Sequence, residues 1–121
     1  SFGVSIVMTS AKFNGKENIN CDFDNKSEIC NYDLDKKSYC FTFKTCNSIG
    51  ALGENAEKVR KLILNNSFFQ NLIFNYPINS ATIMAHTRWA SVGKVVLENA
   101  HPINYINNPG RSFYTRIIFG R

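Results

Sequence analysis

Several features that would narrow the function of a protein are missing from this chain of 121 residues. No apolar run approaches the roughly 20 residues of a membrane-spanning helix, and no signal peptide is visible. No C-x-x-C pair occurs, which disfavours a zinc site; the four cysteines are Cys21, Cys30, Cys40 and Cys46. We therefore expect a cytoplasmic protein without a membrane partner, with reduced thiols, and with Cys40 and Cys46 in its core.

Acidic residues are nearly absent from the last third of the chain. Residues 1–50 balance six lysines against six acids, whereas Glu98 is the one acid in residues 81–121, which hold Arg88, Lys94, Arg111, Arg116 and Arg121. A basic end can attract nucleic acid or an anionic small molecule. Lysine and arginine form no cluster and no motif interleaved with aromatic residues. A solvated basic surface is thus favoured and no nucleic-acid partner is expected, with anion or nucleic-acid binding kept as a rival.

Alternating apolar residues predict four strands. Residues 3–9 place Val4, Ile6 and Met8 on one face, and residues 38–47 do the same with Tyr39, Phe41 and Phe43. Residues 80–89 and 112–119 are the third and fourth strands, the last after a Pro109-Gly110 turn. The polar residues 11–38, which include an Asn14-Gly15 turn signal, are interpreted as an insertion, either a long loop or an irregular hairpin.

Helical spacing appears between the second and third strands. Val59, Leu62 and Ile63 follow the i, i+3, i+4 pattern after acidic residues at 54 and 57, which favour a helix N-terminus. Asn65-Asn66 interrupts this helix, and Ser67–Gln70 fits a capping box that starts a second helix through about Asn75. Its expected buried stripe is Phe69, Leu72 and Ile73. The whole chain is then one α+β domain with a mainly antiparallel sheet.

The rarest residues gather in one stretch, "MAHTRWASVGKVVLENAHPIN", from Met84 to Asn104. It holds the only tryptophan of the chain, Trp89, and both histidines, His86 and His101. Packing accounts for a tryptophan but not for the adjacent Arg88, so Arg88 is a candidate binding residue at the end of the expected strand. The alternatives are a structural ion pair for Arg88 and a core position for Trp89. Two histidines fifteen residues apart lack a convincing third metal ligand.

This stretch resembles the class II glutamine amidotransferase domain of glucosamine-6-phosphate synthase-like enzymes, which are N-terminal-nucleophile hydrolases. Their pattern is approximately His-Thr-Arg-Trp-Ala-Thr-His-Gly, followed by Asn-Ala-His-Pro. Ten positions match: His86, Thr87, Arg88, Trp89, Ala90, Gly93, Asn99, Ala100, His101 and Pro102. Ser1 and Gly3, and the segment 48–63, are similar to upstream parts of the family. The resemblance implies part of an α-β-β-α sandwich and covers most of residues 1–121, apart from the 11–38 insertion and the last dozen residues.

The resemblance also implies an activity, the hydrolysis of L-glutamine to glutamate and ammonia. Ammonia would pass to a synthase or sugar-isomerase domain of the same or another chain, with fructose-6-phosphate as the expected acceptor. Expected substrate-binding residues are Arg88, Trp89, Ser91 and Gly93, and expected supporting residues are His86, Thr87, Asn99 and His101. No metal or organic cofactor is implied, and a homodimer stays open.

The chain departs from the family at its most reactive positions. The family nucleophile is a cysteine at the mature N-terminus, whereas Ser1 aligns with a later strand and no cysteine here is N-terminal. The Asn-Gly pair of the oxyanion hole is also missing, and Val92 replaces a histidine. A fragment of a larger amidotransferase is favoured over a degenerate copy, because the missing pieces lie at both ends. The isolated chain is then expected to be inactive. The rival is a non-catalytic module of the same fold that binds glutamine or a partner.

Overall fold

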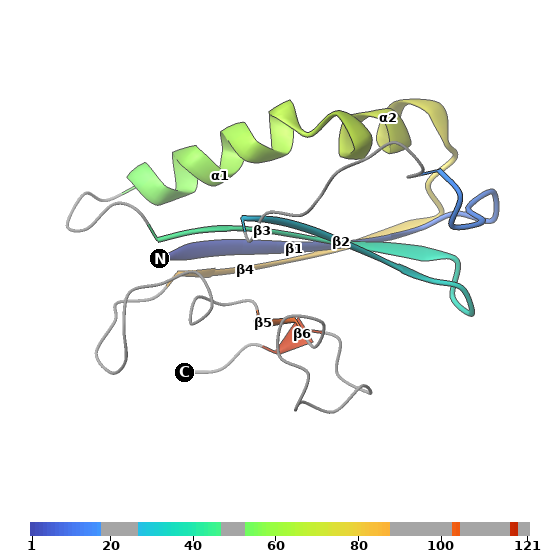
Figure 1. Ribbon diagram of the computed structural model, residues 1–121, viewed down its shortest axis with the longest axis horizontal. Coiled ribbons are helices and arrows are strands. Elements are labelled where there is room, and N and C mark those ends of the chain that lie inside the picture. Colours follow the sequence, from blue (N-terminus) through green and yellow to red (C-terminus); the bar gives the residue numbers. More distant parts are fainter. Residues whose placement is uncertain (18–26, 47–52, 88–102, 105–116, 119–121) are drawn as a thin grey trace.

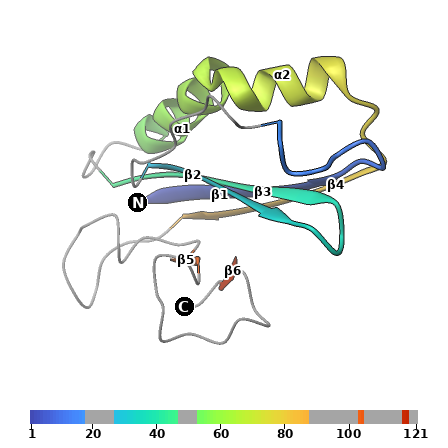
Figure 2. The same cartoon turned by 45° about the vertical axis from the view of Figure 1, so that its right-hand side comes forward.

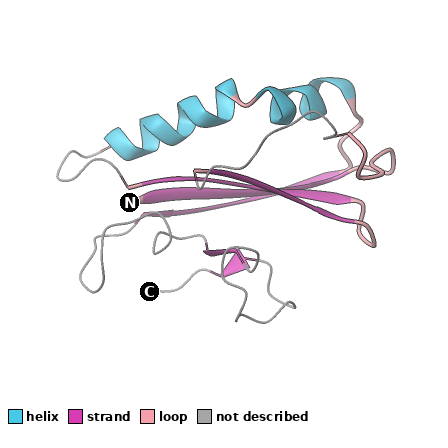
Figure 3. Cartoon of the chain, in the orientation of Figure 1, coloured by secondary structure: helices cyan, strands magenta, loops and turns pink. Residues whose placement is uncertain are grey.

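A computed structural model describes residues 1–17, 27–46, 53–87, 103–104 and 117–118. In these residues two helices lie along one face of a four-stranded antiparallel sheet (Figures 1 and 3). The strands are β1 (Phe2–Thr9), β2 (Glu28–Asp33), β3 (Ser38–Thr45) and β4 (Ser80–Thr87), and the helices are α1 (Glu54–Asn65) and α2 (Ser67–Asn75). The spatial order is β2-β3-β1-β4. The prediction of an α+β fold with an antiparallel sheet is confirmed.

A second, two-stranded pair consists of β5 (Ile103–Asn104) and β6 (Ile117–Ile118). In both views it lies on the side of the large sheet away from the helices (Figures 1 and 2). β6 is the described part of the strand expected at 112–119. The α-β-β-α sandwich stays a prediction, since the described residues supply one helix layer, one four-stranded sheet and this short pair.

The core lies between the helices and the central strands. Val4, Ile6 and Met8 of β1 stand opposite three aromatic residues of β3, as the alternation predicted; these are Phe43, Phe41 and Tyr39. From the helices, Val59, Phe68, Phe69 and Leu72 pack onto them. Burying each such side chain contributes about 1.5–3 kcal/mol. The rings of Phe41 and Phe69 meet edge-to-face with their centroids 5.0 Å apart, which is an arrangement that aromatic pairs prefer.

The long-loop alternative for residues 11–38 is wrong at residues 28–33, which form β2 and pair along β3. The irregular-hairpin alternative fits the described part of this segment. Phe13 stands in a polar stretch of the sequence, yet it is only 1% exposed. Its ring contacts the ring of Tyr39 edge-to-face. The hydroxyl of Tyr32 donates to the carbonyl oxygen of Phe13 at 3.1 Å, which ties the turn to the hairpin.

The start of α2 differs from the predicted capping box. Asn66, not Ser67, is the N-cap, and its side-chain oxygen accepts the backbone N–H of Phe69 at 2.8 Å. Gln70 does not close a box, because its side-chain amide donates to the carbonyl of Ile63 in α1 at 3.0 Å. The predicted stripe is also shifted: Phe68 is buried, whereas Ile73 is 39% exposed. The tight link between the helices turns α2 so that Phe68 faces the sheet.

Candidate functional site

The end of β4 carries the first residues of the unusual stretch. His86 stands opposite Gly3 in β1, and Gly3 stands opposite Lys44 in β3, so the three form one row across the sheet. Neighbouring strands lie about 4.8 Å apart, which places the backbones of His86 and Lys44 roughly 10 Å from each other. Figure 1 shows that the start of β1 and the ends of β3 and β4 lie together at this end of the sheet.

Two faces meet at this end of the sheet. The row of Val4 and Phe43 faces the helices, so the next row, with Gly3, Lys44 and His86, faces away from them. His86 is half-buried on that face. Thr87 belongs to the helix-facing set and is exposed. The two supporting residues that the structure describes therefore point to opposite sides of the sheet.

Lys44 is the charged residue that sequence reasoning passed over. It is only 2% exposed, although lysine is rarely buried. Around it the face away from the helices is polar and tightly covered, with Ser5 and Thr42 both fully buried. The alternation of the strand put Lys44 on this face, but only the register aligns it with His86 across Gly3.

The remaining predicted site residues lie outside the described part of the chain. They are the expected substrate-binding residues Arg88, Trp89, Ser91 and Gly93 and the supporting residues Asn99 and His101. Their roles stay predictions. Within the residues that the structure does describe, no group of three or more His, Cys, Asp or Glu side chains could hold a metal ion.

The described cysteines lie in strands β2 and β3 or directly after β3. Cys40 is 1% and Cys46 is 9% exposed, which confirms the expectation that both belong to the interior. The sulfur of Cys40 lies 3.8 Å from the hydroxyl oxygen of Ser5 on the face away from the helices. Cys30 in β2 is half-buried.

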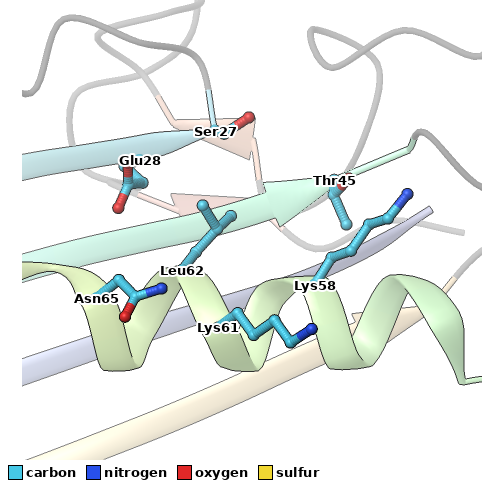
Figure 4. Close-up of a pocket in the computed structure, with 7 residues that line it drawn as sticks. All are labelled: Ser27, Glu28, Thr45, Lys58, Lys61, Leu62 and Asn65. Atoms are coloured by element: carbon cyan, nitrogen blue, oxygen red, sulfur yellow. The ribbon is translucent and has the colours of Figure 1, made fainter.

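A cavity of about 370 Å³ opens between α1 and the neighbouring strands β2 and β3 (Figure 4). Lys58, Lys61 and Leu62 line it from α1, and Glu28 and Thr45 line it from the strands. The charged side chains of this lining are the two lysines and Glu28. The cavity lies at the β2 edge of the sheet, whereas β4 is the opposite edge, so it is separate from His86 and Thr87.

Comparison with known proteins gives one informative similarity. The chain is 39% identical over 56 residues to a protein of Escherichia coli (strain K12) named "Putative glutamine amidotransferase YafJ". The matched part is 46% of this chain and 18% of that protein, so the chain spans under a fifth of the length of the relative. No family model matches the chain, and no solved structure matches it.

This similarity supports a relationship to glutamine amidotransferases at the level of the family. It does not support the narrower resemblance to glucosamine-6-phosphate synthase, and it does not support fructose-6-phosphate as the acceptor of ammonia. Across the described ranges, no helix is long and apolar enough to span a membrane.

Proposed function

We propose that residues 1–121 form part of a class II glutamine amidotransferase unit that binds L-glutamine and belongs to its glutaminase half. The observation that carries the proposal is the 39% identity over 56 residues to the protein named "Putative glutamine amidotransferase YafJ". The motif from His86 to Pro102 agrees with it. The reaction of the whole unit is hydrolysis of the glutamine side-chain amide, which releases glutamate and passes ammonia to an acceptor domain.

The proposed binding chemistry follows from the residue types. Arg88 binds the α-carboxylate of glutamine through two parallel, charge-assisted hydrogen bonds. Ser91 donates a hydroxyl hydrogen bond, and Gly93 lets the backbone approach the ligand closely. Trp89 shields the site from water. His86 and Thr87 support this set from β4, and Asn99 and His101 from the segment that follows. The narrower assignment, a donor of ammonia to fructose-6-phosphate, belongs to the same proposal.

The first test is calorimetric titration of the 121-residue chain with L-glutamine. We expect binding that Arg88→Ala weakens about ten- to a hundredfold, because a charge-assisted pair is worth about 1.5–3 kcal/mol. Arg60→Ala is the matched control, since Arg60 is an exposed arginine of α1 that pairs with Glu57 at 2.8 Å. Equal loss in both variants, or no binding by the folded wild-type chain, would contradict the proposal.

A non-catalytic module of the same fold is the second candidate. Two described cysteines, Cys40 in β3 and Cys46 directly after it, are buried, which removes them as exposed nucleophiles. Both candidates predict that the 121-residue chain binds glutamine without releasing glutamate. They differ for the natural protein: the glutaminase proposal requires an N-terminal cysteine in it, and the module proposal requires none. Intact-mass and peptide mapping of the natural protein separates them.

A further inference from the structure

Among the described strands, β4 lies at one edge of the four-stranded sheet. It pairs with β1 along its whole length, from Ser80 opposite Thr9 to Thr87 opposite Phe2. Within the described ranges, its other edge pairs with no strand. The backbone N–H and C=O groups along such an edge are a ready template for another strand.

The helix layer leaves β4 uncovered. Ile6 of β1 is 6% exposed, whereas Ile83, which stands directly opposite it in β4, is 65% exposed. The reason is that α1 packs over β1 and β3. Met84 is 37% exposed and faces the other side of the sheet, so both faces of β4 present apolar surface.

The two edges of the sheet differ in charge. β2, at the other edge, begins with Glu28 and ends with Asp33. Charged residues of this kind discourage pairing between edges in natural proteins. β4 has the sequence SATIMAHT, with no Asp, Glu, Lys, Arg or Pro over its eight residues. A strand that pairs with its own copy benefits from this neutrality, because like charges that meet across the pair destabilise it.

The helix-facing side of β4 is symmetric in sequence. Ala81, Ile83 and Ala85 share that side, with the large residue in the centre and one alanine two positions away on each side. In an antiparallel pair centred on Ile83, this residue meets the partner's Ile83, and Ala81 meets the partner's Ala85. On the opposite side Thr82 meets the partner's Met84. The strand is therefore complementary to itself in size as well as in charge.

We propose that β4 is a dimerisation edge that pairs antiparallel with β4 of a second copy of this chain, centred on Ile83. The two-fold axis stands perpendicular to the sheet, so both helix layers lie on the same face and the two sheets become one. This inference rests on the exposure, charge and symmetry of β4 and is independent of the proposed glutamine binding.

The first test is the molar mass of the 121-residue chain by light scattering over a concentration series. We expect a monomer–dimer equilibrium that Ile83→Lys weakens at least tenfold, because burial of both isoleucines is lost and like charges meet at the axis. Phe74→Lys is the control: Phe74 is 79% exposed on α2, and its replacement leaves dimerisation unchanged. A chain that is monomeric throughout, or a dimer that Ile83→Lys leaves intact, would overturn the proposal.

A cross-linking test identifies the pair of residues at the axis and does not depend on a destabilising change. Directly opposed residues of antiparallel strands have Cα atoms about 4.5–5.5 Å apart, within the span of a disulfide. Ile83→Cys is expected to give an oxidised dimer joined through position 83 in both copies, identified by peptide mapping. Leu34→Cys, at a site that is 72% exposed in the turn after β2, gives no such product. Equal cross-linking at both sites would place the contact elsewhere.

Discussion

Gly15 shows how a single backbone position constrains the irregular hairpin. Its φ of +85° lies in the left-handed region that side chains disfavour. A Cβ placed there would lie 2.8 Å from a ring carbon of Tyr32, a residue whose hydroxyl already bonds to Phe13. Gly53, at the N-cap of α1, has a nearly equal φ of +80° but nothing within 4 Å of the same added atom. A comparison of the two positions therefore distinguishes the cost of the left-handed backbone from the cost of steric contact.

We predict that Gly15→Ala destabilises the protein more than Gly53→Ala. Both changes bear the cost of a left-handed alanine, about 1–2 kcal/mol. Gly15→Ala must also displace the Tyr32 ring, which adds roughly another 1 kcal/mol or more. Urea unfolding of the two variants beside the wild type measures the difference. Equal losses of unfolding free energy would show that Tyr32 moves aside without cost.

The turn at Gly15 was predictable from the Asn14-Gly15 pair, since glycine after asparagine is a frequent turn signal. Its contact with Tyr32 was not predictable, because the two residues are seventeen apart in sequence and are joined only by the fold. Lys44 is a similar case. Alternation places it on a face, but the alignment with Gly3 and His86 depends on the pairing register.

At the scale of elements, Asn66 controls how α2 leaves α1. Its side chain accepts from the N–H of Phe69 and donates to the carboxylate of Glu28 in β2 at 3.3 Å. It is 5% exposed, whereas its neighbour Asn65 is exposed at the end of α1. One side chain thus joins the helix start to the outer strand.

We predict that Asn66→Ala lowers the free energy of unfolding by about 1–2 kcal/mol, the usual cost of removing a helix cap. Asn65→Ala is the matched control and is expected to change it by less than about 0.5 kcal/mol. Asn66→Ser should recover part of the loss, because serine also caps helices. Thermal or urea unfolding followed by circular dichroism makes the comparison. A loss in Asn65→Ala as large as in Asn66→Ala would assign the effect to helix propensity instead.

Strong periodicity made most elements predictable, and weak periodicity explains the misses. β1, β3 and both helices have three or more apolar residues at regular spacing. β2 was missed because its six residues, EICNYD, begin and end with charges and bury only Ile29. The break at Asn65-Asn66 was evident, but two adjacent asparagines and a following serine are all acceptable caps. Tertiary contact with Glu28 decides between them.

At the scale of the whole molecule, most of the evidence for the function comes from the sequence, and most of the evidence for the fold comes from the structure. The motif from His86 to Pro102 and the similarity to the Escherichia coli protein support the amidotransferase relationship. The structure adds where that motif begins, at the end of an exposed edge strand beside the start of β1. It also separates this end of the sheet from the cavity at the β2 edge, which no sequence pattern indicated.

Stability at alkaline pH tests the packing of the hairpin against the sheet. Burial raises the pKa of Tyr39 above its ordinary value of 10.0, and its hydrogen bond to Glu17, with the oxygens 2.9 Å apart, raises the pKa further. Burial and the nearby Glu17 and Asp33 charges also raise the pKa of Tyr32. Above pH 10 the unfolded chain therefore loses these protons while the folded protein keeps them. Their stabilisation is complete below pH 10 and falls as pH rises through the folded-state pKa values.

We predict that the free energy of unfolding falls as pH rises above about 10, because the unfolded chain then loses tyrosine protons that the folded protein keeps. Tyr39→Phe should be less stable than the wild type at pH 9, because the hydrogen bond to Glu17 is lost at a cost of about 1–2 kcal/mol. The same variant should lose stability less steeply above pH 10, since one titrating group is gone. Urea unfolding at several pH values compares the two slopes. Parallel slopes would contradict the prediction. They would mean that Tyr39, despite its burial and its hydrogen bond to Glu17, ionises as easily in the folded protein as in the unfolded chain.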